Sequence, residues 1–364
     1  MPEPTASVPA PRANPGLVGH ESIERELRHL DRLGRLPHAI LLCGPRGIGK
    51  ATLAFRFVRF LLAKPSDVAA GKSGGAADGG LATDPASSVF RRVASGGHAD
   101  LLTVERAYDP RRRRLRSEII VEDTREIAGF FRLTAAEEGW RIVIIDGAEE
   151  MNRNAANALL KILEEPPQRG LLLLVSHHPG RLLPTIRSRC RRLSLTALAP
   201  PILTQLLEHH RPELKNEERK ALAELSAGSI GRALELADAG GLALYRSLLD
   251  LLSQTPQIDI AELYSLADKL ARPDSEDAYR AVEDLLSQFL ARMVVHAAGR
   301  RTGAVDVIAG EGEVIERLAA RADPARWVTV RDEIIKSFVN TDQLNLDRKQ
   351  VVLGAFFAIE EMAR

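Results

Sequence analysis

The hydrophobic and polar positions of the chain follow two patterns, which change near residue 198. Up to that point, short apolar runs alternate with stretches in which apolar residues recur every three or four positions. A short apolar run is typical of a buried strand, and the three- to four-residue spacing is typical of an amphipathic helix. Beyond residue 198 the strand-like runs stop, and from about residue 244 the helical spacing continues to the C-terminus. The pattern predicts an α/β domain followed by helical domains.

The first pattern predicts a regular series of strands and helices. Its apolar runs predict strands at 38–43, 101–105, 141–146 and 171–176, and its helical spacing predicts helices at 20–34, 50–63, 123–134 and 152–165. Asn152 is suited to cap the last of these helices, and Pro166 with Pro167 is suited to end it. Strands that alternate with helices imply a parallel sheet that is covered on both faces.

Two stretches depart from either pattern. Residues 1–16 are rich in proline and alanine and predict a disordered tail, and residues 64–98 turn to Gly, Ala, Ser and Asp and predict a flexible insertion. The expected organisation is therefore an α/β domain over 17–197, a small helical domain over 198–242 and a C-terminal helical domain over 243–364.

Composition narrows the class of protein. Hydrophobic residues make up 45% of the 364-residue chain and aromatic residues only 4%, so the core must consist mainly of Ala, Leu, Ile and Val. A net charge of +1 argues against a protein that coats a polyanion. No apolar run reaches the length of a membrane span, and the N-terminus lacks the apolar stretch of a secretion signal. Cys43 and Cys190 have no paired spacing. These features predict a soluble, reduced, cytoplasmic protein without a disulfide framework or a metal site.

The stretch "GPRGIGKATL" resembles a phosphate-binding loop between a strand and a helix. Gly44, Gly47, Gly49 and Lys50 are in register with that motif. Backbone N–H groups of such a loop form an anion site at the start of the helix, and Lys50 would add a charge near the β- and γ-phosphates. The alternative is a tight strand-to-helix turn with an incidental lysine.

Two groups needed for nucleotide hydrolysis are missing. Ala51 stands where a hydroxyl should hold magnesium, and Thr52 carries a hydroxyl about 100° away around the helix. Asp146 fits the strand-end aspartate that holds magnesium, but Gly147 follows where a glutamate would orient the attacking water. We therefore expect nucleotide binding at most, without hydrolysis.

For two charged stretches, exposure to solvent is a simpler explanation than catalysis or DNA binding. Glu149 and Glu150 could do acid–base work, but near a helix start we expect them to be solvated. The arginine-rich stretch 106–116 could contact DNA phosphates. With few aromatic residues for stacking on bases, a solvated loop is the better expectation.

Four stretches together resemble the delta prime subunits of the bacterial DNA polymerase III clamp loader, which belong to the AAA+ class. They are "GRLPHAILLCGPRGIGKA", "IIDGAEEMNRNAANALLKILEEPP", "LLPTIRSRCRRLSL" and "NLDRKQVVLGAF". The resemblance extends from about Leu17 to the C-terminus. Its most specific parts are Asn157–Pro167 and Ser188–Cys190. In this family delta prime typically has a degenerate nucleotide site, whereas its tau/gamma relatives hydrolyse ATP.

The resemblance implies an AAA+ P-loop domain, a helical lid and an all-α collar that assembles a ring. It implies tau/gamma and delta subunits as partners, and the sliding clamp and primed DNA as partners of the complex. Arg189 matches the arginine that points into the neighbouring ATP site; the alternative is a basic helix end that bonds local carbonyls. Arg232 matches an arginine that senses nucleotide state; the alternative is an exposed helical arginine.

The resemblance implies no required cofactor and at most vestigial ATP binding. Related ATPase domains often carry a four-cysteine zinc module, but the stretch 64–98 contains no cysteine, and His98 alone cannot hold a structural zinc. Three alternatives remain: an active tau/gamma-like ATPase, a free-standing AAA+ DNA motor such as a branch-migration helicase, and an assembly scaffold outside replication. Ala51 and Gly147 argue against the first two.

Overall fold

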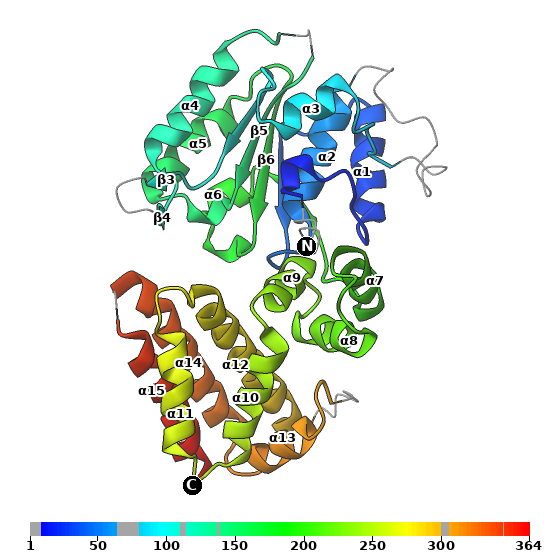
Figure 1. Ribbon diagram of the computed structural model, residues 1–364. Coiled ribbons are helices and arrows are strands. Elements are labelled where there is room, and N and C mark those ends of the chain that lie inside the picture. The colour runs from blue at the N-terminus through cyan, green and yellow to red at the C-terminus, as the bar shows by residue number, and fades with distance from the viewer. Residues whose placement is uncertain (1–8, 64–79, 110–113, 137–138, 300–305, 345) are drawn as a thin grey trace. The chain divides into compact units, whose positions relative to one another are not determined.

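The computed structural model describes residues 9–63, 80–109, 114–136, 139–299, 306–344 and 346–364. The chain divides into two compact units, the first ending at Leu198 and the second beginning at Ala199. The first contains a sheet flanked by helices, and the second is helical (Figure 1). This confirms the predicted α/β domain and the change of pattern near residue 198. Apart from Leu198, the regions predicted as lid and collar, 198–242 and 243–364, both fall in the second unit.

The first unit follows the predicted alternation of strands and helices. Its strands are β1 (Ala39–Cys43), β2 (Leu101–Val104), β3 (Tyr108–Asp109), β4 (Arg114–Leu115), β5 (Arg141–Asp146), β6 (Gly170–Ser176) and β7 (Arg191–Ser194). Its α-helices are α1 (Glu21–Arg32), α2 (Lys50–Leu62), α3 (Ser88–Ala94), α4 (Val121–Arg132), α5 (Arg153–Glu164) and α6 (Pro184–Arg187). Short 3₁₀ helices are η1 (Pro11–Ala13), η4 (Ala148–Glu150) and η5 (Pro179–Arg181).

The main sheet is parallel, with the strand order β2-β5-β6-β1-β7 within the described residues. Every residue of β1 and β6 is buried, as expected for strands covered on both faces. Ile40 and Leu42 pack into one core with α2, whereas Leu41 and Cys43 pack into another with α5 and α6. Because neighbouring residues of a strand point to opposite faces, one apolar run supplies both cores. The prediction of helices on both faces is confirmed.

Helix α5 begins and ends where its sequence predicts. The side chain of Asn152 accepts a hydrogen bond from the backbone N–H of Ala155 at 2.9 Å, and so caps the helix. The helix ends at Glu164, just before the two prolines. Its Leu159 and Leu163 are buried against the sheet.

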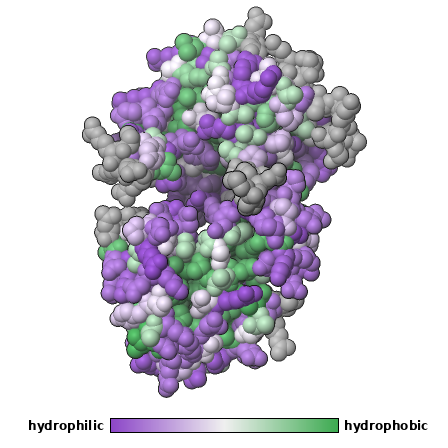
Figure 2. Space-filling model, viewed as in Figure 1, coloured by the Kyte–Doolittle hydropathy of each residue, from purple (hydrophilic) through white to green (hydrophobic). Residues whose placement is uncertain are grey.

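The second unit is built of α7 (Pro200–His210), α8 (Asn216–Leu225), α9 (Ile230–Asp238), α10 (Gly241–Ser253), α11 (Ile260–Leu270), α12 (Glu276–Ala297), α13 (Glu311–Ala319), α14 (Pro324–Leu344) and α15 (Arg348–Ala363). A buried polar contact joins its middle helices: the Tyr245 hydroxyl donates to Glu311 at 2.7 Å, and Arg292 pairs with the same carboxylate. Figure 2 shows apolar residues gathered on the face of this unit that is turned toward the viewer. None of the described helices combines the length and the hydropathy that crossing a bilayer requires.

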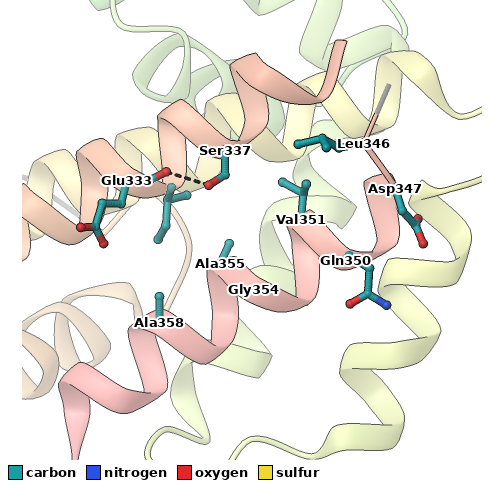
Figure 3. A pocket seen from close by; sticks show the side chains of 10 residues that line it. Glu333, Ser337, Leu346, Asp347, Gln350, Val351, Gly354, Ala355 and Ala358 are labelled. Atoms are coloured by element: carbon teal, nitrogen blue, oxygen red, sulfur yellow. Dashed lines mark hydrogen bonds between the residues drawn. The ribbon is translucent and has the colours of Figure 1, made fainter. Parts of the chain in front are cut away.

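A surface groove of about 480 Å³ lies along α14 and α15 (Figure 3). Glu333 and Ser337 line it from α14, and Val351, Gly354 and Ala358 line it from α15. An ideal Cβ placed on Gly354 would meet no heavy atom within 4 Å. Small residues of α15 are therefore part of the lining, and the Cβ position of Gly354 is open to solvent.

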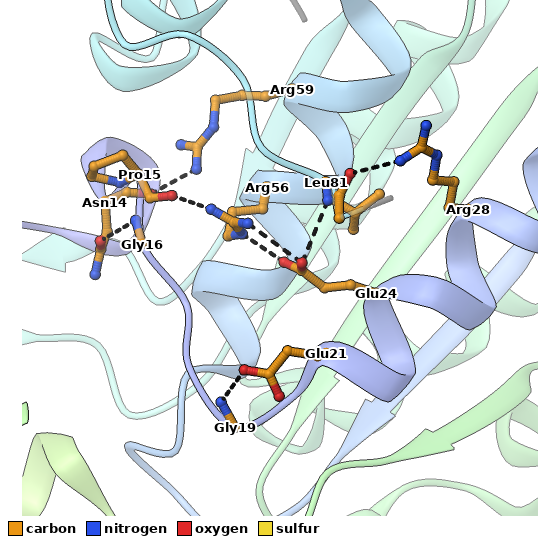
Figure 4. Close-up of polar contacts among 11 residues, drawn as sticks. Asn14, Pro15, Gly16, Gly19, Glu21, Glu24, Arg28, Arg56, Arg59 and Leu81 are labelled. Carbon is orange, nitrogen blue, oxygen red and sulfur yellow. Dashed lines mark hydrogen bonds and ion pairs between the residues drawn. The ribbon is translucent and has the colours of Figure 1, made fainter. Parts of the chain in front are cut away.

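Residues 9–16, which the sequence assigned to a disordered tail, are instead held against α2 (Figure 4). The Arg59 guanidinium donates to the carbonyl oxygens of Arg12 at 2.8 Å and Asn14 at 2.7 Å, and Arg56 donates to that of Pro15. Buried guanidinium groups need acceptors, and this backbone supplies them. The prediction is wrong for these residues; residues 1–8 lie outside the described residues.

The predicted flexible insertion 64–98 also contains ordered structure. Residues 64–79 lie outside the described residues, but α3 follows, with Val89 and Val93 fully buried in the core shared with α2. The three- to four-residue spacing of these apolar side chains was masked by the Gly- and Ala-rich average of the whole stretch. The prediction is therefore wrong for α3.

Candidate functional site

The loop from Gly44 to Lys50 connects β1 to α2 and requires glycine at three positions. Gly44, Gly47 and Gly49 have φ values of 148°, 74° and 101°, a region that other residues rarely adopt. A Cβ on Gly44 would lie 2.4 Å from the Leu195 carbonyl oxygen. Glycine thus fits the backbone conformation at all three positions, and at Gly44 it also leaves room for the residue that follows β7.

Lys50 is buried and bonded to its own loop. The residue as a whole is 3% exposed, and Nζ donates to the carbonyl oxygens of Gly44 at 2.7 Å and Pro45 at 2.5 Å. Burial lowers the pKa of Lys50 to about 8, although the nearby carboxylates of Glu149 and Asp146 act in the opposite direction. The Lys50 ammonium therefore joins the end of the loop to its beginning.

Asp146 lies at the same edge of the sheet as the loop, as predicted. It ends β5, while Cys43 ends β1 and Ser176 ends the strand between them. Burial raises the pKa of Asp146, with a further contribution from Glu105, and the Lys50 charge opposes both. The structure therefore brings Lys50 and Asp146 into one electrostatic environment at the carboxyl ends of the strands.

Glu149 differs from its predicted role as a solvated residue. It is half-buried, and its Oε1 accepts hydrogen bonds from the backbone N–H groups of His177 at 2.7 Å and His178 at 3.1 Å. Burial alone would raise the pKa of Glu149, but hydrogen bonds from its own backbone N–H and from that of His177 lower it below its ordinary value. The turn η4 directs this carboxylate back toward β6, and local sequence could not show that.

The second acidic residue of the pair has a separate contact. Glu150 forms an ion pair with Arg106 at 2.9 Å, although burial raises the pKa of this carboxyl. Arg106 lies just before the β3–β4 hairpin, so the pair ties the base of the predicted basic loop to η4. Residues 110–113 of that loop lie outside the described residues.

His177 belongs to the same environment, and sequence reasoning missed it. Burial, together with the Lys50 charge, lowers its pKa to about 4, although Glu149 acts in the opposite direction. A signal was available: His177 directly follows the apolar run of β6, and polar residues in that position lie at the carboxyl edge of a parallel sheet.

The structure shows the surroundings of Ala51 and Gly147, the two positions that lack a hydrolytic group. Ala51 and Thr52 form the start of α2, and Thr52 is buried there. Gly147 has a φ of 73°, and a Cβ at this position would lie 2.6 Å from an Oε2 atom of Glu150. A glutamate at position 147 would therefore strain the backbone as well as displace Glu150.

Arg189 lies at the surface of the first unit, just after α6. Its NH2 group pairs with Oε1 of Glu164 at 2.8 Å, and its NH1 group donates to the Thr185 carbonyl oxygen at 3.1 Å. The second bond is the local carbonyl contact that the alternative interpretation predicted. The side chain is nevertheless 36% exposed, so part of the guanidinium faces solvent.

Arg232 belongs to α9 in the second unit. Its Nε pairs with Asp284 of α12 at 3.3 Å, and burial lowers the pKa of the guanidinium. Arg232 is thus partly buried and ties two helices of this unit together, unlike the exposed helical arginine of the alternative interpretation, and its predicted nucleotide-sensing role stays a prediction.

Within the described ranges, no group of three or more His, Cys, Asp and Glu side chains is placed to hold a metal ion. Cys43 and Cys190 are free thiols. The backbone N–H of Asp100 donates to Nδ1 of His98 at 3.2 Å, so that ring contributes to local structure.

Comparison with known proteins finds similarity to subunits of DNA polymerase III. The family model described as "DNA polymerase III, delta subunit" matches residues 19–199. The chain is 40% identical to the DNA polymerase III subunit delta′ of Pseudomonas aeruginosa over 199 residues, which are 54% of each protein. It is 32% identical to subunit tau of Escherichia coli over 63% of this chain and 33% of that protein. The matched stretch thus spans about half the length of the first relative and a third of the second.

A solved structure is also similar. The DNA polymerase III gamma subunit-related protein of Thermotoga maritima aligns with 93% of this chain and 99% of its own, at 19% identity and a TM-score of 0.43.

Proposed function

The chain belongs to the AAA+ family of DNA polymerase III clamp-loader subunits, and on that premise we propose that it serves as a delta prime subunit without ATP hydrolysis of its own. The observation that carries this proposal is the phosphate loop, whose architecture is intact while two hydrolytic groups are absent. Ala51 lacks the hydroxyl for magnesium, and Gly147 lacks the group that orients water. Residual ATP binding would be vestigial, and no metal is required.

The contacts of Lys50 and the backbone at Gly147 support a loop that has a structural role instead of a catalytic one. Lys50 donates to Gly44 and Pro45 of its own loop, and its lowered pKa reduces its charge just above neutral pH. The left-handed backbone at Gly147 disfavours a glutamate there. Restoring a hydroxyl by Ala51→Ser alone should therefore not produce turnover.

The proposed contribution of the subunit is Arg189, donated to the ATP site of an adjacent tau/gamma subunit. A guanidinium offsets the charge that develops on the transferred phosphoryl group. Arg189 is partly exposed and follows Ser188 in the segment that resembles the family. In the same proposal, the C-terminal helices join the tau/gamma and delta subunits, and the complex meets the sliding clamp and primed DNA.

The test is Arg189→Ala in a reconstituted complex, with Arg187→Ala as the matched control because Arg187 is an exposed neighbour at the end of α6, two residues before Arg189. A trans arginine is worth roughly 10³ to 10⁵ in rate at a single site. A complex with several sites should lose less, because its other sites keep their own arginines. We expect reduced ATPase stimulated by DNA and clamp, normal assembly, and poor rescue by Arg189→Lys. A mutant complex that assembles and hydrolyses ATP at the wild-type rate would contradict the proposal.

The second candidate is an active tau/gamma-like ATPase, which the E. coli tau similarity brings into consideration. The isolated chain separates the two functions. Steady ATP turnover that disappears in Lys50→Ala would favour the active enzyme, whereas turnover at background level in both proteins would favour the delta prime role.

A further inference from the structure

We propose that Glu164 is a positioning residue for Arg189, which holds the guanidinium in place for a phosphoryl group on a neighbouring subunit. This inference rests on the proposed function, because it assigns to Arg189 a reacting partner outside this chain. The observation behind it is the 2.8 Å contact between Oε1 of Glu164 and the NH2 group of Arg189.

The position of Glu164 in the fold allows it to restrict the motion of the Arg189 side chain. It is the last residue of α5, and the preceding Leu163 and Leu159 are 3% and 0% exposed in the core. The same helix is capped by Asn152 at its other end. The backbone that carries the carboxylate is therefore anchored by packing, although the carboxylate itself is exposed.

The guanidinium is attached at two points. One terminal nitrogen contacts Glu164 and the other contacts the Thr185 carbonyl oxygen at 3.1 Å. Two contacts on different nitrogens fix both the direction and the plane of the group. A guanidinium has five N–H donors, so further donors remain for an anion that approaches the 36% exposed side chain.

The Glu164–Arg189 ion pair is not required for the stability of the fold. Exposed ion pairs contribute little to folding stability, and both side chains here are substantially exposed. Ordering a long side chain during a reaction, by contrast, costs free energy at the step where it must act. A guanidinium that is already oriented avoids that cost in the transition state, which is the advantage of positioning.

The experiment measures ATP hydrolysis, stimulated by primed DNA and clamp, in the reconstituted complex. It compares wild type with Glu164→Gln, Arg189→Ala and the double variant. Glu164→Gln keeps the shape of the side chain while removing its charge. Glu165→Gln is the matched control, since it makes the same change at the next, exposed residue. Native mass spectrometry confirms that each complex is assembled.

We expect Glu164→Gln to lower kcat roughly two- to tenfold, the effect of leaving one long side chain unordered, and to leave the KM for ATP unchanged. The loss should not exceed that of Arg189→Ala. In the Arg189→Ala background the Glu164 substitution should have no further effect, because its only route of action is gone. Glu165→Gln should match wild type.

Three outcomes would overturn the inference. If Arg189→Ala is impaired and Glu164→Gln hydrolyses ATP normally, the positioning role fails while the proposed function stands. If the two losses multiply in the double variant, Glu164 acts by another route. If Arg189→Ala is itself normal, the proposed trans arginine fails and the positioning role fails with it. Should Glu164→Gln not assemble, Glu164→Asp, which keeps the charge, must restore both assembly and kcat.

Discussion

At the scale of residues, the carboxyl edge of the sheet concentrates charges that modify one another. Burial and neighbouring charges displace the pKa values of Lys50, Asp146 and His177, and hydrogen bonds lower the pKa of Glu149. Such clusters often mark catalytic sites. Here the contacts that are present hold the loop and the turns together: Lys50 bonds two loop carbonyls, and Glu149 bonds two backbone N–H groups after β6. These charged groups thus serve as structural support at the carboxyl edge of the sheet.

The lowered pKa of His177 predicts how the free energy of unfolding depends on pH. Its folded pKa is about 4, below its ordinary value of 6.5. Between these pH values the unfolded chain binds a proton that the folded chain does not, so the free energy of unfolding falls as pH drops from about 6.5 toward 4. We expect His177→Asn to lose less stability than wild type across this window in urea denaturation. His178→Asn, at the adjacent exposed position, should follow wild type. Parallel curves for all three proteins would contradict the prediction.

At the scale of elements, α2 is the centre of the first unit. Its amino end closes the phosphate loop, one side packs on the sheet, and two buried arginines hold residues 12–15 (Figure 4). Arg59 also lies over the Phe90 ring of α3 at 4.5 Å, and burial lowers its pKa to about 10. Arg56 pairs with Glu24 of α1 at 2.7 Å, so one helix fixes the N-terminal segment, α1 and α3 together.

Removal of Arg56 should therefore destabilise the whole first unit. In the Arg56–Glu24 pair both side chains are 8% exposed, and Arg56→Met would leave a buried carboxylate without its main partner. We expect a loss of about 3–5 kcal/mol in the free energy of unfolding. Arg25→Met, on the exposed side of α1, should change it by less than about 0.5 kcal/mol. The double variant Glu24→Met with Arg56→Met should recover part of the loss; equal stability of Arg56→Met and wild type in chemical denaturation would refute this role.

At the scale of the whole molecule, the chain separates a sheet-based unit from a helical unit, each with its own core. The proposed function assigns the nucleotide-like site and Arg189 to the first unit and assembly to the second. The groove along α14 and α15 is a feature of the second unit that suits assembly, because Gly354 leaves open space along it (Figure 3). Small residues at such a position allow another helix to approach closely.

A larger side chain in the groove should block assembly without harming the fold. Gly354→Gln meets no heavy atom within 4 Å of its Cβ, and glutamine favours helix more than glycine does by up to about 1 kcal/mol. We expect an unchanged or higher Tm and reduced incorporation with the tau/gamma and delta partners in native mass spectrometry. Gly129→Gln is the matched control, since Gly129 also has an open Cβ position in an exposed part of α4. Normal incorporation of Gly354→Gln would exclude the groove as an assembly surface.

The sequence by itself determined four strands of the main sheet (β1, β2, β5 and β6), the coverage of that sheet, the phosphate loop and the cap of α5. These follow from local rules: apolar runs, glycines that permit positive φ, and a side chain that bonds a nearby N–H. Lys50 and Asp146 were predictable together, because residues at the carboxyl ends of parallel strands share an edge.

Only the tertiary structure decided which long-range partners the charged residues have. Glu149 bonds the segment after β6, Arg56 and Arg59 order a proline-rich segment, and Glu164 contacts Arg189. The members of each pair are 25 to 47 residues apart, and a charged side chain carries no local pattern that names its partner. Burial creates the demand for a partner, and burial is set by packing between elements rather than by the residues on either side.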